Sequence, residues 1–337
     1  RVRCSHSFIA TDSDSGRMAF PMKPYSIAWS SFSTNKIYIY DSELGVASEG
    51  VDGTKLPGFG VNLLYHIPKT NYLVCSTTVN NYSKFEVLDA SKNLKRAYTF
   101  EKEPGTIFDL RYNEKTNMVA LLSNRDKVAY HLFDITDMEL AKKAKWPAAH
   151  KSNMASQDFD SEGKKIATLD EAGVCLISDV NSDSPLYCLK VGQSGNYNKC
   201  RWNPISPLLA LSFDETRFNL VDTEKQQIMH IHHLKLHNDY RIYQIDWNKN
   251  GNILASCSAD RSVNIYDIRT PKNSVRSFIS QQPSIVVSVR WSSCGSMLAA
   301  GGCEIPAMVL DFGTGKTFYQ SKNRDGISSN SLNFLEQ

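Results

Sequence analysis

Three closely spaced histidines are residues of this sequence that could bind a metal ion. His230 and His232 would point to the same side of a β-strand, because successive side chains alternate along a strand, and His233 follows them directly. Two imidazoles on one face can ligate zinc or copper, but no cysteine, aspartate or glutamate stands at a spacing that completes the ligand set. We therefore predict a polar outer strand here and no metal site.

A Gly-Lys-Thr triplet at residues 315–317 resembles the end of a phosphate-binding loop. That motif requires a glycine five residues before Gly315, where this sequence has Leu310, and the motif opens a helix. This triplet follows a run of strand character and no helical pattern comes after it. We predict a turn between two strands, and we expect no cofactor.

A histidine, a serine and an aspartate, the residue types of a hydrolase triad, occur together at His237, Ser256 and Asp260. A comparable set occurs earlier in the chain, at His150, Thr168 and Asp170. A catalytic triad is needed once, whereas a hydrogen-bond network that pins a loop is useful in many repeats. We predict that both sets are structural, that there is no catalytic site, and that the protein is not an enzyme.

The elements that would position these residues are given by a repeat. An apolar run that ends in aspartate recurs seven times, and the successive aspartates are 43 to 48 residues apart. An aromatic residue closes an earlier apolar run, 20 to 24 residues before each aspartate. The aspartates are Asp41, Asp89, Asp134, Asp179, Asp222, Asp267 and Asp311, and the aromatic residues are Phe20, Tyr65, Tyr112, Phe159, Trp202, Trp247 and Trp291. Each unit therefore holds three clear strands, with a weaker fourth strand after the aspartate.

The sixth unit carries the clearest pattern. Residues 237–247 end in Trp247, an Asn250-Gly251 turn follows, and two further apolar runs end in Asp260 and Asp267. This unit resembles a WD40 repeat, which spans about 40–45 residues and forms four strands. The resemblance covers the whole chain and is strongest in units four to seven, although no unit ends in the family's Trp-Asp pair. It implies an all-β fold, a seven-bladed WD40-type β-propeller that occupies residues 1–337 as a single domain.

Three segments compete to complete the ring of blades: Val2–Ile9, Lys316–Gln320 and Ser328–Leu335. We expect the N-terminal segment to close the last blade. The Ser- and Asn-rich residues 321–337 are then expected to form a partly mobile tail, or else the closing strand itself.

The composition is that of an ordinary globular protein. Of the 337 residues, 41% are apolar and 22% are charged, and no stretch approaches the ~20 apolar residues that a membrane-spanning helix requires. The net charge of +3 does not indicate a protein that binds nucleic acid by charge alone. The eight cysteines are dispersed, mostly within apolar runs, so we predict free thiols and a location in the cytoplasm, the nucleus or both.

The resemblance also implies a function. WD40 propellers are rigid platforms for protein partners, so we expect a non-catalytic scaffold or adaptor subunit of a multiprotein complex, with no small-molecule substrate. The family's binding face is built by the loop before each first strand and by the turn before each third strand. Carried over to this sequence, that face offers Tyr240, Arg241, Tyr197, Asn196, Asn153, Arg125 and Gln282. Tyrosine and arginine are frequent binding hot spots.

Three alternative roles remain open, and one of them is a propeller enzyme, which clustered carboxylates or metal ligands at the central channel would favour. Residues 266–269 resemble the Trp-Asp-x-Arg box of WD40 substrate receptors in cullin-type ubiquitin ligases, with Tyr266 in place of the tryptophan, and this role would use Arg269. A histone-tail or nucleic-acid reader would use the same face as the scaffold. Acidic pockets or an aromatic cage would favour histone tails, and a continuous basic surface would favour nucleic acid.

Overall fold

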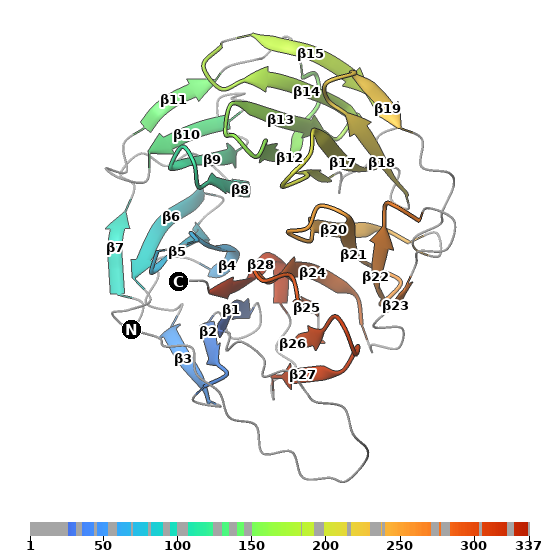
Figure 1. Cartoon of the computed structure of the whole chain (residues 1–337). Helices are drawn as coiled ribbons and strands as arrows, with labels where there is room; N and C mark the ends of the chain where they lie inside the picture. Colours follow the sequence, from blue (N-terminus) through green and yellow to red (C-terminus); the bar gives the residue numbers. More distant parts are fainter. Residues whose placement is uncertain are drawn as a thin grey trace.

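The computed structural model is built of β-strands set around a central axis (Figure 1). It describes residues 26–31, 36–43, 46–52, 59–68, 70–79, 82–89, 95–99, 107–123, 130–134, 140–144, 150–182, 184–191, 199–213, 217–229, 237, 240–270, 276–277, 284–302, 305–321 and 327–335. These residues form seven antiparallel sheets of four strands each, and no helix occurs among them. The expected all-β propeller is therefore the observed fold. No described segment forms a helix long and apolar enough to span a lipid bilayer.

The strands follow the chain in order, with one exception in the first sheet. That sheet has the order β28-β1-β2-β3, with β28 (Ile327–Leu335), β1 (Ser26–Ser31), β2 (Lys36–Asp41) and β3 (Val46–Asp52). The second sheet is β4 (Phe59–His66), β5 (Tyr72–Val79), β6 (Tyr82–Asp89) and β7 (Lys95–Thr99). The third is β8 (Ile107–Asn113), β9 (Met118–Ser123), β10 (Tyr130–Asp134) and β11 (Leu140–Ala144).

The remaining four sheets have the same topology. The fourth is β12 (Met154–Phe159), β13 (Lys165–Asp170), β14 (Val174–Asp179) and β15 (Pro185–Lys190). The fifth is β16 (Lys199–Trp202), β17 (Leu208–Phe213), β18 (Arg217–Asp222) and β19 (Gln227–Met229). The sixth is β20 (Ile242–Trp247), β21 (Ile253–Ser258), β22 (Val263–Asp267) and β23 (Arg276–Ser277), and the seventh is β24 (Val286–Trp291), β25 (Met297–Gly302), β26 (Ile305–Asp311) and β27 (Thr317–Gln320).

The two sequence series mark fixed positions in these sheets. Each of the seven aspartates is the last residue of a third strand, from Asp41 in β2 to Asp311 in β26. The aromatic series from Tyr65 to Trp291 lies in the innermost strands, β4 to β24, and Phe20 lies outside the described residues. The period of the sequence is therefore the period of the sheets.

The core lies between neighbouring sheets. All six residues of β21 and all six of β25 are buried, because a strand in the middle of such a sheet is covered on both faces. Between the sixth and seventh sheets, Ile253 and Ile265 pack in one cluster with Val289, Trp291 and Leu298. The outer strand β15 instead alternates between half-buried and exposed residues. Sheets that cannot cover themselves are thus covered by their neighbours in the ring.

The ring is closed by the C-terminal strand. β28 pairs antiparallel with β1, with Ile27 opposite Phe334 and Trp29 opposite Leu332. Phe334 packs in a buried cluster with Ile27, Trp29 and Val309. β28 takes the innermost place of the first sheet and β27 completes the seventh, so Ser328–Leu335, one of the three competing segments, supplies the closing strand, whereas the preferred N-terminal strand in the last blade and a mobile tail are not what the described residues form. Residues Val2–Ile9 lie outside the described part.

Two of the sequence predictions concern outer turns and strands. The Gly313–Thr317 segment forms a turn between β26 and β27, in which Thr314 N donates to Asp311 Oδ1 at 2.5 Å and Gly315 adopts φ = 74°. The predicted turn is confirmed. The three closely spaced histidines, residues 230–233, lie outside the described residues, directly after β19.

Candidate functional site

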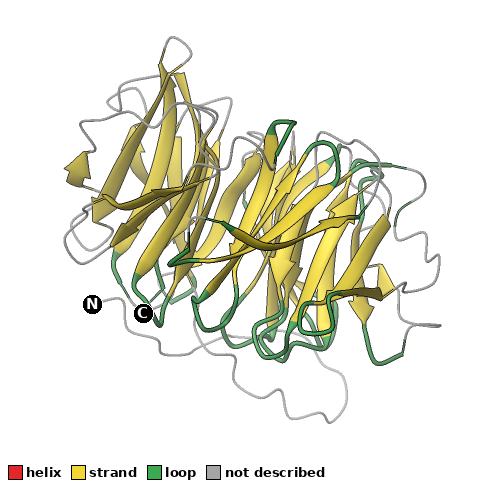
Figure 2. Ribbon diagram, turned by 90° about the horizontal axis from the view of Figure 1, so that it is seen from above, coloured by secondary structure: helices red, strands yellow, loops and turns green. Residues whose placement is uncertain are grey.

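The two ends of the propeller carry different connections between the strands. One end, here called the loop face, carries the segments before each first strand and the turns between second and third strands. The other, the turn face, carries the turns between first and second strands and those between third and fourth strands; the described turns gather along this lower edge in Figure 2. Of the eight predicted partner-binding residues, the structure describes Asn153, Tyr240 and Arg241 on the loop face and Arg269 on the turn face. Arg125, Asn196, Tyr197 and Gln282 lie outside the described residues.

A buried hydrogen-bond network supports the loop that carries Tyr240 and Arg241. His237 Nδ1 lies 2.9 Å from Asp260 Oδ2, and His237 Nε2 lies 2.9 Å from Ser256 Oγ. Burial alone would raise the pKa of Asp260, but hydrogen bonds from His237 and Ser262 outweigh it and lower this pKa to about 2. The aspartate is therefore a charged anchor at neutral pH.

The same turn is bonded to the backbone of the loop. Ala259 N donates to Arg241 O at 2.9 Å, and Ser258 Oγ donates to Tyr240 O at 3.4 Å. The loop before β20 is thus fixed to the turn after β21.

A second copy of the network lies in the fourth sheet. His150 Nδ1 is 2.9 Å from Asp170 Oδ2, and His150 Nε2 is 2.9 Å from Thr168 Oγ1. Glu171 N donates to Asn153 O at 2.8 Å, so this loop is also fixed to its neighbouring turn. The prediction that both sets pin loops is confirmed by these bonds.

Tyr240 is the most prominent of the predicted residues. Its side chain is 54% exposed, although the loop that bears it is held by the His237 network. Arg241 is half-buried, and Asn153 is exposed and donates through Nδ2 to Glu171 Oε2 at 3.1 Å. The loop face therefore presents a large amphipathic ring on a well-supported backbone.

Arg269 is not brought together with these residues. It lies in the turn after β22, on the turn face, where Nε donates to Asp267 Oδ1 at 2.9 Å and Nη2 to Asp267 Oδ2 at 2.6 Å. Its guanidinium is exposed, but its Nε–Nη2 edge is already bound by the aspartate two residues before it.

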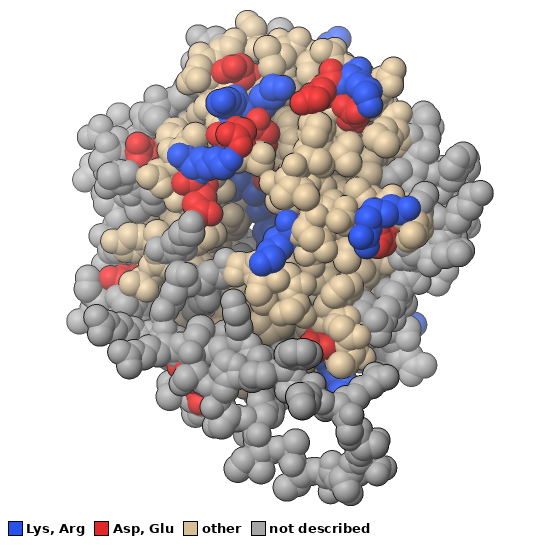
Figure 3. Space-filling view, in the orientation of Figure 1, with Lys and Arg blue, Asp and Glu red and all other residues tan. Residues whose placement is uncertain are grey.

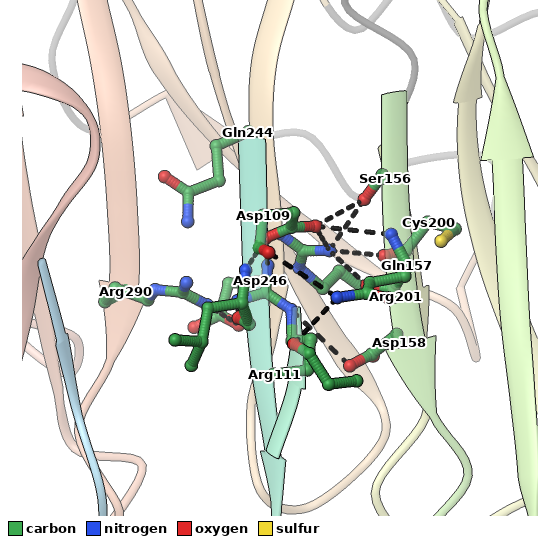
Figure 4. Close-up of polar contacts among 12 residues, drawn as sticks. Asp109, Arg111, Ser156, Gln157, Asp158, Cys200, Arg201, Gln244, Asp246 and Arg290 are labelled. Carbon is green, nitrogen blue, oxygen red and sulfur yellow. Dashed lines mark hydrogen bonds and ion pairs between the residues drawn. The ribbon is translucent and has the colours of Figure 1, made fainter. Parts of the chain in front are cut away.

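A ring of charged side chains that was not predicted from the sequence lies in the wall of the central channel. Five successive innermost strands, β8, β12, β16, β20 and β24, carry a charged residue directly before the closing aromatic residue. These residues are Arg111, Asp158, Arg201, Asp246 and Arg290, so the sign of the charge alternates around the channel (Figure 4). We call this set the charged ring. The alternation was readable in the sequence beside the aromatic series, but it has no meaning until the strands are known to face one channel.

Ion pairs and backbone contacts join the members of the charged ring. Arg111 Nε lies 3.5 Å from Asp158 Oδ1, and Arg290 Nη1 lies 3.4 Å from Asp246 Oδ1. Each aspartate also accepts a hydrogen bond from the backbone of the innermost strand of the next sheet. Asp158 Oδ2 accepts from Trp202 N of β16 at 2.6 Å, and Asp246 Oδ2 accepts from Trp291 N of β24 at 2.8 Å. The ring thus ties neighbouring sheets together.

A further aspartate, Asp109, lies deeper in the channel. Its Oδ1 is 3.2 Å from Arg111 Nη2, and its Oδ2 is 3.5 Å from Arg201 Nη1 and accepts from Ser156 Oγ at 2.9 Å. Because side chains alternate along a strand, Asp109 and Arg111 of β8 face the same side. The arginines are therefore held from below by a buried carboxylate.

Burial controls the charges of the ring. It raises the pKa of Asp158 to about 7, because the attraction of Arg111 and the bond from Trp202 offset the loss of solvent only in part. Burial also raises the pKa of Asp246, against Arg290 and the bond from Trp291. For Arg111, burial would lower the pKa, but Asp109 and Asp158 outweigh it and raise it.

A pocket of about 320 Å³ opens beside the charged ring on the turn face. Its wall contains the three arginines of the ring, and its rim contains Lys249 and Trp202. Figure 3 shows this face with a hollow at its centre and basic side chains within the hollow. Among the described residues, no group of three or more histidines, cysteines, aspartates and glutamates could hold a metal ion.

Comparisons with known proteins agree with this fold. Residues 200–294 match the family model of the WD40 domain of anaphase-promoting complex subunit 4. A WD repeat-containing protein of Dictyostelium discoideum is 33% identical over 113 residues. That match covers 33% of this chain and 6% of the Dictyostelium protein, so it spans a small part of the relative's length.

Proposed function

We propose that this chain, which belongs to the WD40-repeat family, is a non-catalytic scaffold that binds protein partners on its loop face within a multiprotein complex. The family suggests a role in protein interaction. The observation that carries the finer proposal is Tyr240, a 54% exposed aromatic side chain on a loop held by buried hydrogen bonds.

The loop that carries Tyr240 is preorganised for binding, which favours affinity. A surface loop that is ordered on binding loses conformational entropy, and this loss subtracts from affinity. The loop of Tyr240 is already bonded to the turn after β21, so little remains to be ordered. Tyrosine adds a broad apolar ring with a polar tip, which is why it is common among binding hot spots.

The experiment is a comparison of partner recovery by matched variants. Partners captured by the wild-type chain are identified, and the affinity of each is then measured for Tyr240→Ala combined with Arg241→Ala. We expect a loss of at least ~2 kcal/mol, about 30-fold in affinity. Leu186→Ala is the control, because Leu186 is 53% exposed but lies on the outer strand β15. A folded double variant that binds normally, beside a control that loses binding, would place the interface on the rim.

The free thiols of the protein bear on its location in the cell. We propose that the protein works in the cytoplasm or the nucleus, where thiols stay reduced. Cys175 and Cys188 of neighbouring strands carry free thiols in the structure, and burial raises the pKa of Cys175 well above its usual range. Imaging of the tagged chain in its own cells tests this; secretion would contradict it.

No described contact favours the ubiquitin-ligase role or the reader role. A ubiquitin-ligase receptor would need Arg269 for its partner, whereas this guanidinium is already bound by Asp267. A reader of histone tails or nucleic acid would need an acidic cage or a continuous basic surface on the loop face. The described loop-face side chains of Asn153, Glu171, Tyr240 and Arg241 mix polar, acidic, aromatic and basic types, so they form neither.

A further inference from the structure

The turn-face pocket contains hydrogen-bond donors that the described residues leave unused. Arg201 Nε and Nη2 and Arg290 Nε and Nη2 have no hydrogen-bond partner there, and neither does Trp291 Nε1. The side chain of Arg201 is only 4% exposed, and that of Arg290 is 12% exposed. A buried guanidinium nitrogen without an acceptor costs free energy, so it calls for an acceptor that enters the pocket.

The contacts of these arginines leave one edge of each guanidinium group without a hydrogen-bond acceptor. Arg201 uses Nη1 alone, which donates to Ser156 Oγ at 3.1 Å and to Cys200 O at 2.5 Å and faces Asp109. Arg290 likewise uses Nη1, toward Asp246. The remaining edge, Nε with Nη2, is the edge of a guanidinium that binds carboxylate or phosphate oxygens in pairs.

The charge of the pocket wall limits what can enter. Four cations, Arg111, Arg201, Arg290 and Lys249, line the pocket with two carboxylates, Asp158 and Asp246, and Asp109 lies behind Arg111 and Arg201, so positive charge is in excess. A phosphate monoester carries about −1.5 to −2 charges at neutral pH and would balance this excess. A polyphosphate would bring more negative charge against the two aspartates than a monoester does.

The remaining wall is aromatic. Tyr65 stands between two of the cations, with Arg111 and Arg290 each 6.0 Å from its ring centroid. Trp202, Trp247 and Trp291 lie around the opening. The volume of about 320 Å³ is at the lower end of the range for small-molecule sites. It has room for a phosphate and one compact group beside it.

We propose that the turn-face pocket is a binding site for a small phosphate monoester, held by Arg201 and Arg290, whose buried Nε and Nη2 atoms have no acceptor among the described residues. This site is separate from the proposed partner surface, which lies on the loop face at the other end of the channel. The scaffold would therefore carry a small ligand and a protein partner on opposite faces.

The test measures binding of defined phosphates to the purified wild-type chain by calorimetry, with sodium chloride at matched ionic strength as reference. The probes are inorganic phosphate, phenyl phosphate and a short phosphotyrosine peptide. We expect saturable binding of phosphate and at least tenfold tighter binding of phenyl phosphate, because its ring contacts the aromatic wall. Equal affinity for the peptide and phenyl phosphate would show that the phosphate can come from a protein, whereas weaker peptide binding would show that only a free small molecule fits.

The variants assign the binding to the pocket. Arg201→Gln and Arg290→Gln should each weaken phosphate binding at least tenfold, whereas Arg269→Gln, an exposed arginine of the same face, should leave it unchanged. Asp246→Asn should tighten binding, because it removes a negative charge while its amide oxygen can still accept from Trp291 N. A misfolded variant would weaken binding, so this opposite sign separates the proposal from loss of structure. No saturable binding beyond chloride, equal losses in the Arg269 and Arg290 variants, or weaker binding by Asp246→Asn would overturn the proposal.

Discussion

Asp260 beneath the loop face and Asp158 in the charged ring are both shielded from solvent, but their pKa values move in opposite directions. The side chain of Asp260 is 7% exposed and that of Asp158 is 15% exposed. The pKa of Asp260 falls to about 2, whereas that of Asp158 rises to about 7. Burial disfavours the charged form in both places and does so more strongly for Asp158, which lies deeper in the protein, and the surrounding donors differ as well.

The donors differ in number and distance. Asp260 accepts from Ser262 Oγ at 2.6 Å and from Ser262 N at 2.9 Å, with His237 Nδ1 at 2.9 Å. Asp158 accepts from Trp202 N at 2.6 Å, but its arginine, Arg111, stays 3.5 Å away and is shared with Asp109. Close hydrogen bonds that belong to one carboxylate therefore stabilise its charge more than a formal positive charge that several carboxylates share.

The largest expected effect concerns Asp158. Its folded pKa of about 7 lies above the unfolded value of 3.8, so the folded state holds the extra proton between these pH values. The stability that this group contributes is present below pH 4 and is lost as the pH rises to about 7, by up to about 4 kcal/mol. Asp158→Asn should remove this dependence, so the variant gains stability relative to wild type from pH 5 to pH 8.

Urea denaturation at pH 5 and pH 8, at equal ionic strength, measures this difference. The conservative variant Glu162→Gln, on the exposed turn after β12, serves as the control and should follow the wild type at both pH values. If wild type and Asp158→Asn change in parallel, Asp158 is ionised at pH 5 and the contrast with Asp260 disappears.

The next effect concerns the network beneath the loop face. Asp260→Ala leaves His237 and Ser262 without their shared acceptor, at a cost of roughly 1–3 kcal/mol. Because the pKa of Asp260 is depressed, its contribution should persist above pH 4 and be lost only as the pH falls toward 2. Thermal denaturation at pH 7 should show a lower melting temperature, and an unchanged melting temperature would mean that the network does not support the fold.

The smallest effect is expected for the ion pair of Arg269 and Asp267 at the surface. It has short hydrogen bonds of 2.6 and 2.9 Å, but the arginine is exposed to solvent and salt. Exposed ion pairs contribute little to stability. Arg269→Gln should therefore leave the melting temperature unchanged within error at both low and high salt, and a clear loss would show that bond length outweighs exposure in this protein.

The sequence predicted the repeating parts of the fold and missed the parts that depend on closure. The aspartates at the ends of third strands and the aromatic residues of the first strands follow one period, because each sheet repeats the same packing. The closing strand does not follow that period: β28 fills the place that the pattern of the first unit assigned to the chain around Phe20. Which terminal strand takes that place depends on pairing across the whole ring.

The candidate site was predicted to a similar extent. The His237 and His150 networks could be predicted because their members recur at matched positions within single units. The charged ring could not, because Arg111, Asp158, Arg201 and their partners belong to different units. Their ion pairs exist only when five innermost strands surround one channel.

The pairing of β28 with β1 sets a time order for folding. Ser26 lies opposite Leu335, so the first sheet cannot be completed during synthesis until residues up to Leu335 have emerged. Until then β1 has an unpaired inner edge, which is a template for any other strand. If β28 of one molecule reaches β1 of another first, the same contacts give a domain-swapped dimer. The relative rates of pairing within one chain and between two chains therefore decide whether β28 completes a monomer or a domain-swapped dimer.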